Sequence, residues 1–187
     1  TFPFAQKIRH EMEAELKIGP GAEYAYIERH VHGAEGGVVV VPRSKVRVCE
    51  GARYQTDFEL IKGRVGEISI DVEVTGEARS VSEVNARVSG TKDDRISITE
   101  TGHLVGEYAR GVLNTSIALR DDARAEIYNT LIATAPYARG HVDCKEIVQG
   151  NAVAKAVPIV EVHHPKAHIT HEAAIGSVDS KQLETLM

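Results

Sequence analysis

The chain has 187 residues, of which 42% are hydrophobic and 26% are charged, and its formal net charge is −5. This length fits one folded domain, and the acidic balance argues against nucleic acid as the main partner, because phosphate binding needs clustered lysine and arginine. No stretch approaches the ~20 consecutive apolar residues of a membrane span. Two cysteines cannot form a disulfide framework, so we expect a reducing, cytoplasmic setting.

Residues 1–17 are predicted to form a short N-terminal helix. Apolar residues recur there at every fourth position among polar ones, which is typical of an apolar stripe along a helix. The pattern stops at Gly19-Pro20-Gly21, a sequence that ends helices. The stripe consists of Phe4, Ile8, Met12 and Leu16.

Residues 18–176 are predicted to be β-structure. Apolar and polar residues alternate there, for example from Ile68 to Val74 and from Arg95 to Thr99. An alternation of period two buries one face of a strand and exposes the other. The region therefore contains many strands, each with one face toward a core.

A loose internal repeat organises these strands. A turn-like residue precedes an alanine, and a charged residue often follows, as in Gly51-Ala52-Arg53. The steps between the alanines are 30, 26, 31, 14, 15 and 14 residues, as if two turns per coil are marked late and one early. Repeats of ~20–50 residues with strand patterning favour a β-solenoid, whose coils stack on one another. A β-sandwich of short strands remains the alternative. The alanines are Ala22, Ala52, Ala78, Ala109, Ala123, Ala138 and Ala152.

Two histidines in the first third of the chain suggest a metal site. His30-Val31-His32, followed by Glu35, is similar to the motif with which cupin enzymes bind a divalent ion. The spacing to Glu35 is one residue short of that motif, and its second part does not follow downstream. The plainer interpretation is a pair of solvated histidines beside the glycine-rich segment 33–37.

Nucleotide-binding and hydrolase motifs are missing. The sequence has no Gly-x-x-x-x-Gly-Lys-Ser/Thr loop and no Gly-x-Ser-x-Gly elbow. Any nucleotide chemistry would therefore have to come from a partner.

The last third of the chain carries a family resemblance. The segments DCKEIVQG (143–150), AVPIVEV (156–162) and AHITHEAAIGSVDSKQL (167–183) follow one another. This order resembles the SufB/SufD family of iron–sulfur cluster assembly proteins, and the likeness extends from about Gly111 to Met187. Residues 177–187 are similar to the start of that family's C-terminal helical segment.

The resemblance implies a right-handed parallel β-helix core and a scaffold without catalytic activity of its own. It also implies a SufB/SufD-type partner or a homodimer, an ABC-type ATPase of the SufC kind, and acceptor apo-proteins. The helical segment that begins here holds SufC in the family. By resemblance, Cys144 six residues before Gly150 takes a role in cluster assembly, and His171 and Glu172 fall on the family's His-Glu motif. The family's further cysteine would fall on Val153.

The spacing of the candidate ligands allows a prediction about their geometry. Cys144 and His171 are 27 residues apart, close to one coil, so we expect them to stack at about 4.8 Å. Lys145 and a protonated His171 would then lower the pKa of the Cys144 thiol. His171 and Glu172 would point to opposite faces of a flat strand and act together only across a bulge.

Counting ligands limits how a cluster could be held. Iron–sulfur clusters usually take about four protein ligands, mostly cysteines. Cys144, His171 and Glu172 are too few, so we expect a transient cluster shared between two protomers. The plainer interpretation of Cys144 is a small buried apolar residue, and Cys49 is predicted to be structural. A cupin-like or other β-solenoid metal- or ligand-binding enzyme remains the alternative function.

Overall fold

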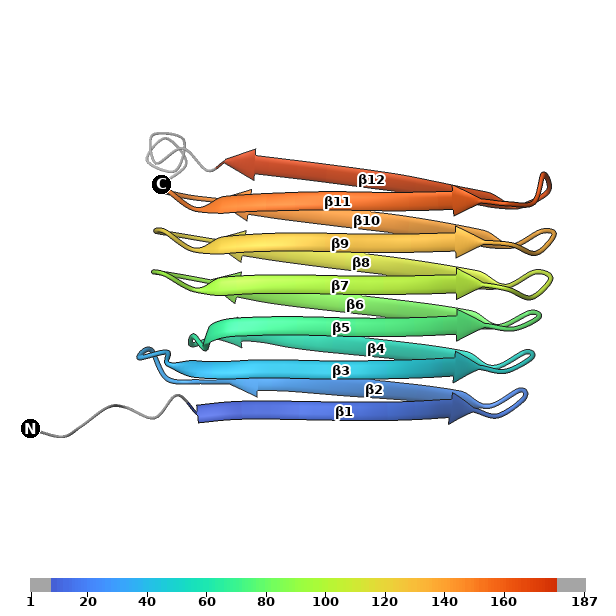
Figure 1. Ribbon diagram of the computed structural model, residues 1–187, viewed down its shortest axis with the longest axis horizontal. Coiled ribbons are helices and arrows are strands. Elements are labelled where there is room, and N and C mark those ends of the chain that lie inside the picture. The colour runs from blue at the N-terminus through green and yellow to red at the C-terminus, as the bar shows by residue number, and fades with distance from the viewer. Residues whose placement is uncertain (1–7, 178–187) are drawn as a thin grey trace, which may run out of the picture.

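The alternating pattern folds as strands from Ile8 to Ser177, and residues 8–177 are those that the computed structural model describes. Within this range the chain forms two six-stranded parallel sheets and no helix. Odd-numbered strands form one sheet and even-numbered strands form the other, so the chain crosses between them at every turn (Figure 1). The first sheet contains β1 (Ile8–Ile18), β3 (Val38–Val48), β5 (Gly66–Gly76), β7 (Arg95–Leu104), β9 (Arg124–Ala133) and β11 (Val153–Val162). The second contains β2 (Glu23–Val31), β4 (Arg53–Lys62), β6 (Val81–Gly90), β8 (Arg110–Leu119), β10 (Arg139–Val148) and β12 (His168–Ser177).

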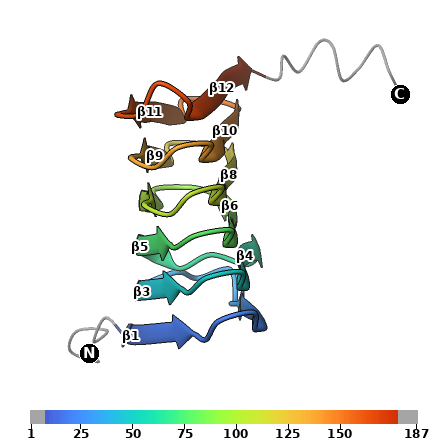
Figure 2. The ribbon, with the colours of Figure 1, turned by 90° about the vertical axis from the view of Figure 1, so that its right-hand side faces the viewer.

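The arrangement confirms the predicted β-solenoid. The two sheets stand as facing stacks when the molecule is viewed along its strands (Figure 2). Every strand pair is parallel, whereas a β-sandwich is built from antiparallel strands. The sandwich alternative is therefore excluded.

The pairing register explains the alanine repeat. Arg110 pairs with Val81 on one side and with Arg139 on the other, which gives a coil of 29 residues. Ala109 and Ala138 end successive turns, and both are fully buried. The irregular steps around Ala78 arise because Ser80, also fully buried, takes the equivalent position in its turn.

The residue before the buried alanine takes a left-handed conformation at one end of the solenoid. Glycine occupies this position in the first coils, at Gly21 and Gly51, with φ of 67° and 66°. Later coils place a tyrosine there, at Tyr108 and Tyr137, both with φ of 59°. The two tyrosine rings stack on each other at 4.8 Å between centroids. This ring contact accompanies a backbone conformation that L-residues seldom adopt.

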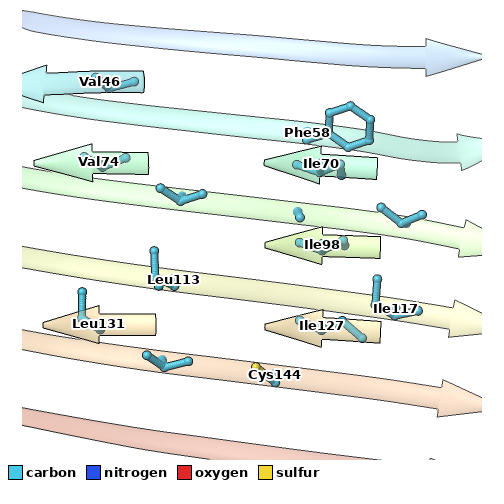
Figure 3. Packing of buried hydrophobic residues seen from close by; sticks show 14 of the residues in the cluster. Val46, Phe58, Ile70, Val74, Ile98, Leu113, Ile117, Ile127, Leu131 and Cys144 are labelled. Atoms are coloured by element: carbon cyan, nitrogen blue, oxygen red, sulfur yellow. The ribbon is translucent and has the colours of Figure 1, made fainter. Parts of the chain in front are cut away.

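Branched aliphatic side chains fill the space between the two sheets. Ile98, Ile127 and Leu131 have essentially no exposed surface, and they interdigitate with residues of the opposite sheet (Figure 3). Cys144 lies in the same cluster, near its C-terminal end. The core is therefore apolar along most of its length.

The predicted N-terminal helix is wrong where the structure describes it. Residues from Ile8 onward form β1, which pairs in register with all of β3. The physical reason is that a period of four is also a multiple of two. Met12 and Leu16 therefore share the inward face of a strand as well as they would share a helix stripe, and pairing with β3 decides between the two.

The remaining terminal predictions fall outside the described residues. Residues 1–7 belong to this group, and so do residues 178–187, in which the C-terminal helix was predicted. Ser177 itself is the last residue of β12. Among residues 8–177, no helix is long and apolar enough to cross a bilayer.

Candidate functional site

Cys144 lies inside the solenoid and has no exposed surface. The alternation of β10 turns its side chain inward, between Val142 and Glu146 on the same face. In the register of the sheet it stacks on Thr115 below and on Ala173 of the edge strand β12 above. One coil therefore separates this thiol from the C-terminal end of the described solenoid.

A column of polar side chains connects the thiol with a buried carboxyl group. The amide nitrogen Nδ2 of Asn129 donates to Cys144 Sγ at 3.6 Å and to Thr115 Oγ1 at 2.8 Å. Thr115 Oγ1 in turn donates to Glu100 Oε2 at 3.1 Å. All four residues are at least 99% buried. Polar groups are seldom placed in the middle of an apolar core unless they act there.

Several atoms in and beside this polar column have no hydrogen-bond partner within the described chain. They are Glu100 Oε1, Asn129 Oδ1 and both carboxyl oxygens of Glu146. Burial raises the pKa of Glu100 to about 8, and burial together with the charge of Asp143 raises the pKa of Glu146. At neutral pH, Glu100 is therefore mostly protonated, and its O–H can serve as a donor.

A small cavity lies below the polar column. It measures about 30 Å³ and is lined by residues of the first four coils, including Glu28, Phe58 and Glu100. A cavity of this size has room for a water molecule beside Glu100. The interior is thus polar at both ends of a mostly apolar core.

The predicted activation of the Cys144 thiol is wrong. Lys145 points to the outer face, where its Nζ donates to Asp143 Oδ2 at 2.5 Å. Burial, followed by the nearby Glu146, Glu100 and Asp143 carboxyl groups, raises the pKa of Cys144 to about 12. The thiol is therefore protonated at neutral pH, because no cation reaches it inside the core.

The predicted stacking of Cys144 on His171 is also wrong. His171 pairs with Val142, two residues away from Cys144 along the strand, and Glu172 pairs with Asp143 on the outer face. The pairing of β10 with β12 runs without a shift, so no bulge brings His171 and Glu172 to one face. Both side chains are exposed. The structure keeps the three predicted ligands apart: one is buried, one is exposed on the same face, and one lies on the opposite face.

The cupin-like set is rearranged. His30 and His32 lie together, with His32 Nε2 3.4 Å from His30 Nδ1, but the carboxyl partner of His30 is Glu28 and not Glu35. Glu35 is exposed, and its backbone carbonyl accepts from Arg64. A cupin is a double-sheet jelly roll, so the parallel solenoid also removes the cupin alternative.

The sequence analysis missed Glu100, Asn129 and Thr115 as site residues, although a signal was present. Glu100 follows Ile96 and Ile98 in the inward phase of β7, where an apolar residue is expected. A charged residue in an inward phase is a sequence-level mark of a buried polar group. Their convergence on Cys144 depends on pairings across coils, which the sequence did not specify.

Comparison with known proteins gives a consistent family match. Residues 5–187 match the family described as SUF system FeS cluster assembly, SufBD core domain. An iron–sulfur cluster assembly SufBD family protein of Methanocaldococcus jannaschii is 41% identical over 187 residues, which cover 100% of this chain and 59% of the relative. A SufBD family protein of Pyrococcus horikoshii is 36% identical over 186 residues, covering 100% of this chain and 56% of that protein. A third relative, from Archaeoglobus fulgidus, is 22% identical over 159 residues, or 84% of this chain and 42% of its own length. The chain thus spans less than two thirds of these curated relatives.

Proposed function

The chain belongs to the SufBD core family of the SUF system for iron–sulfur cluster assembly, and from this premise we propose that it is a scaffold. Clusters are assembled on it and delivered to acceptor apo-proteins in the cytoplasm. The observation that carries the proposal is the position of Cys144. Its thiol ends a buried polar column and lies one coil below the edge strand β12.

Cys144, His171 and Glu172 are the proposed ligands of the cluster. Cys144 and His171 share the inward phase of adjacent strands, which supports them as a pair, whereas Glu172 needs β12 to shift or detach from β10. One thiolate, one imidazole and one carboxylate cannot close a stable site for a cluster. We therefore propose that the cluster is transient and is completed by a second protomer.

Anaerobic reconstitution with iron and sulfide tests this assignment. We expect charge-transfer absorption in the visible range that Cys144→Ala abolishes and Cys49→Ala leaves nearly intact. His171→Ala should make the cluster more labile, because it removes the nearest exposed imidazole on the inward face. Cys49 is a matched control, since it is also a free and buried cysteine. Equal losses in both cysteine variants would indicate an unspecific iron–sulfide adduct and contradict the scaffold assignment.

The proposed partners are a SufC-type ABC ATPase and a SufB/SufD-type protein or a second copy of this chain. ATP hydrolysis would take place in the ATPase, since this chain is proposed to be a non-enzymatic component. We place the ATPase contact in the segment from residue 177 onward, which lies outside the described residues except for Ser177. A pull-down should therefore show stronger capture by a chain extended with the C-terminal part of a full-length relative. Tight capture by a chain that ends at residue 176 would place the contact on the solenoid instead.

A further inference from the structure

A second group of chemically active side chains lies on the first coil, at the opposite end of the solenoid from Cys144. His10 is on β1, and Glu28 and His30 are on the facing strand β2. All three occupy the inward phase of their strands. One donor atom from each lies within 4.8 Å of the other two, and this is the one such group found among residues 8–177.

We propose that His10, Glu28 and His30 bind one divalent transition-metal ion. Two imidazoles and a carboxylate suit zinc and similar ions, whereas magnesium and calcium prefer oxygen ligands throughout. Bonds of about 2.0–2.2 Å place two ligand atoms of one zinc ion at most about 4.4 Å apart. Small side-chain rotations are therefore enough to bring the three donor atoms together.

The neighbouring hydrogen bonds support this assignment. His30 Nε2 already lies 2.6 Å from Glu28 Oε1, so these two donor atoms point to the same place. The other ring nitrogen of His30, Nδ1, lies 3.4 Å from His32 Nε2, and the Tyr26 hydroxyl donates to the second carboxyl oxygen of Glu28 at 3.3 Å. Metal-binding histidines and carboxylates usually have such outer partners, which fix their orientation.

The coil above the group shields it from water on one side. Glu28 pairs with Phe58, His10 pairs with Val40, and the Phe58 ring lies 5.1 Å from the ring of His30. The side chains of His30 and Glu28 are only 11% and 12% exposed. His10 is exposed, so an ion has access from its side. Three protein ligands leave one coordination position of a tetrahedral ion open.

The pair of His163 and Glu161 provides a matched control within the same chain. It has the same spacing of two residues, and His163 Nε2 lies 2.9 Å from Glu161 Oε2. Its side chains are 57% and 47% exposed, and it belongs to no group of three potential ligands. A simple surface ion pair should therefore behave like this pair.

The test is a titration of the untagged, EDTA-treated chain with Zn²⁺ by calorimetry and with Co²⁺ by visible absorption. We expect one ion per chain, and excess Mg²⁺ should not displace it. His10→Ala and Glu28→Gln should each weaken binding at least about tenfold, because loss of even an outer partner costs about 10–100-fold. His32→Ala should weaken binding by about tenfold and keep the stoichiometry at one. Binding to His163→Ala and Cys144→Ala should be unchanged.

These variants keep the result interpretable. Glu28→Gln preserves the shape of the side chain and His10 is exposed, so both should keep the far-ultraviolet circular dichroism of the native chain. Zn²⁺ binding that is no weaker in the folded His10→Ala and Glu28→Gln variants would overturn the proposal. A loss as large in His163→Ala or in Cys144→Ala would overturn it as well, because the ion would then be bound elsewhere. These outcomes are independent of cluster reconstitution at Cys144.

Discussion

The thiol of Cys144 is held in a chemically quiet state by its surroundings. It lies in an apolar core with three carboxyl groups nearby, and together they disfavour the thiolate and raise its pKa to about 12. Iron binds to the thiolate, so ligation must expel a proton from this site. A scaffold with a protected thiol would react only when its end coil opens.

Alkylation measures this protection directly. In a Cys49→Ala background at pH 8, we predict that iodoacetamide modifies Cys144 at least about a hundredfold more slowly than a free cysteine, whose pKa is about 8.5. Mass spectrometry of the intact chain gives the rate. Unfolding in guanidinium should restore the ordinary rate. A fast reaction in the native chain would show that the thiol is exposed or ionised.

Glu100 should make the stability of the fold depend on pH. Its pKa is raised from 4.5 to about 8 in the folded chain, so the folded state binds a proton that the unfolded state has already released. Stability is therefore fully retained below about pH 4.5 and falls as the pH rises to about 8, by up to about 1.4 kcal/mol per pH unit.

Urea unfolding of Glu100→Gln at pH 5 and at pH 8 tests this dependence. The amide cannot ionise, so we predict a smaller loss of stability between the two pH values than in the native chain. Glu107→Gln, in an exposed turn, should retain the native dependence. If Glu100→Gln loses as much stability as the native chain does, then Glu100 is not protonated inside the fold.

At the scale of single strands, packing depends on glycines that leave room for large neighbours. A Cβ atom at Gly140 of β10 would lie 2.4 Å from Leu131 Cδ2 and 3.3 Å from the carbonyl oxygen of Gly111. Leu131 is fully buried, so it cannot move aside without displacing other core residues. The glycine therefore sets how closely β10 approaches the opposite sheet.

Gly140→Ala should destabilise the fold by about 1–3 kcal/mol, which is the usual cost of overpacking a core. Gly176→Ala is the matched control on β12, because a Cβ atom there has no neighbour within 4 Å. It should change stability by less than about 0.5 kcal/mol. Chemical unfolding of both variants gives the two values, and a neutral Gly140→Ala would mean that Leu131 has room to rotate.

Strands also show how far the sequence could predict this fold. The alternation from Ile68 to Val74 correctly predicted a strand, and the turn alanines correctly predicted the coil length of about 29 residues. The apolar stripe of β1 was compatible with both helix and strand, and only its pairing with β3 decides between them. The position of His171 failed for a similar reason. A register difference of two residues moves a side chain by two places along the neighbouring strand, and the loose repeat did not resolve it.

At the scale of the whole molecule, a solenoid must protect its ends. The outer edge of β12 pairs with no other strand in the described part of the chain, and Ile175 of this strand is 54% exposed. Ile175 takes the inward phase, because it pairs with the buried Glu146 of β10. An exposed strand edge with apolar side chains is a template for another chain. We propose that a second copy covers this end and supplies the remaining cluster ligands.

This proposal predicts that assembly and cluster binding are coupled. Light scattering of the native chain should give about twice the monomer mass of 20.3 kDa. Ile175→Lys should shift the population to monomer and lower the yield of reconstituted cluster in parallel, because each half-site alone has too few ligands. Ile61→Lys is the matched control, since Ile61 is 62% exposed but lies on β4, which pairs with β2 and β6. A monomeric Ile175→Lys variant with full cluster yield would contradict a shared site and would locate all the ligands in one chain.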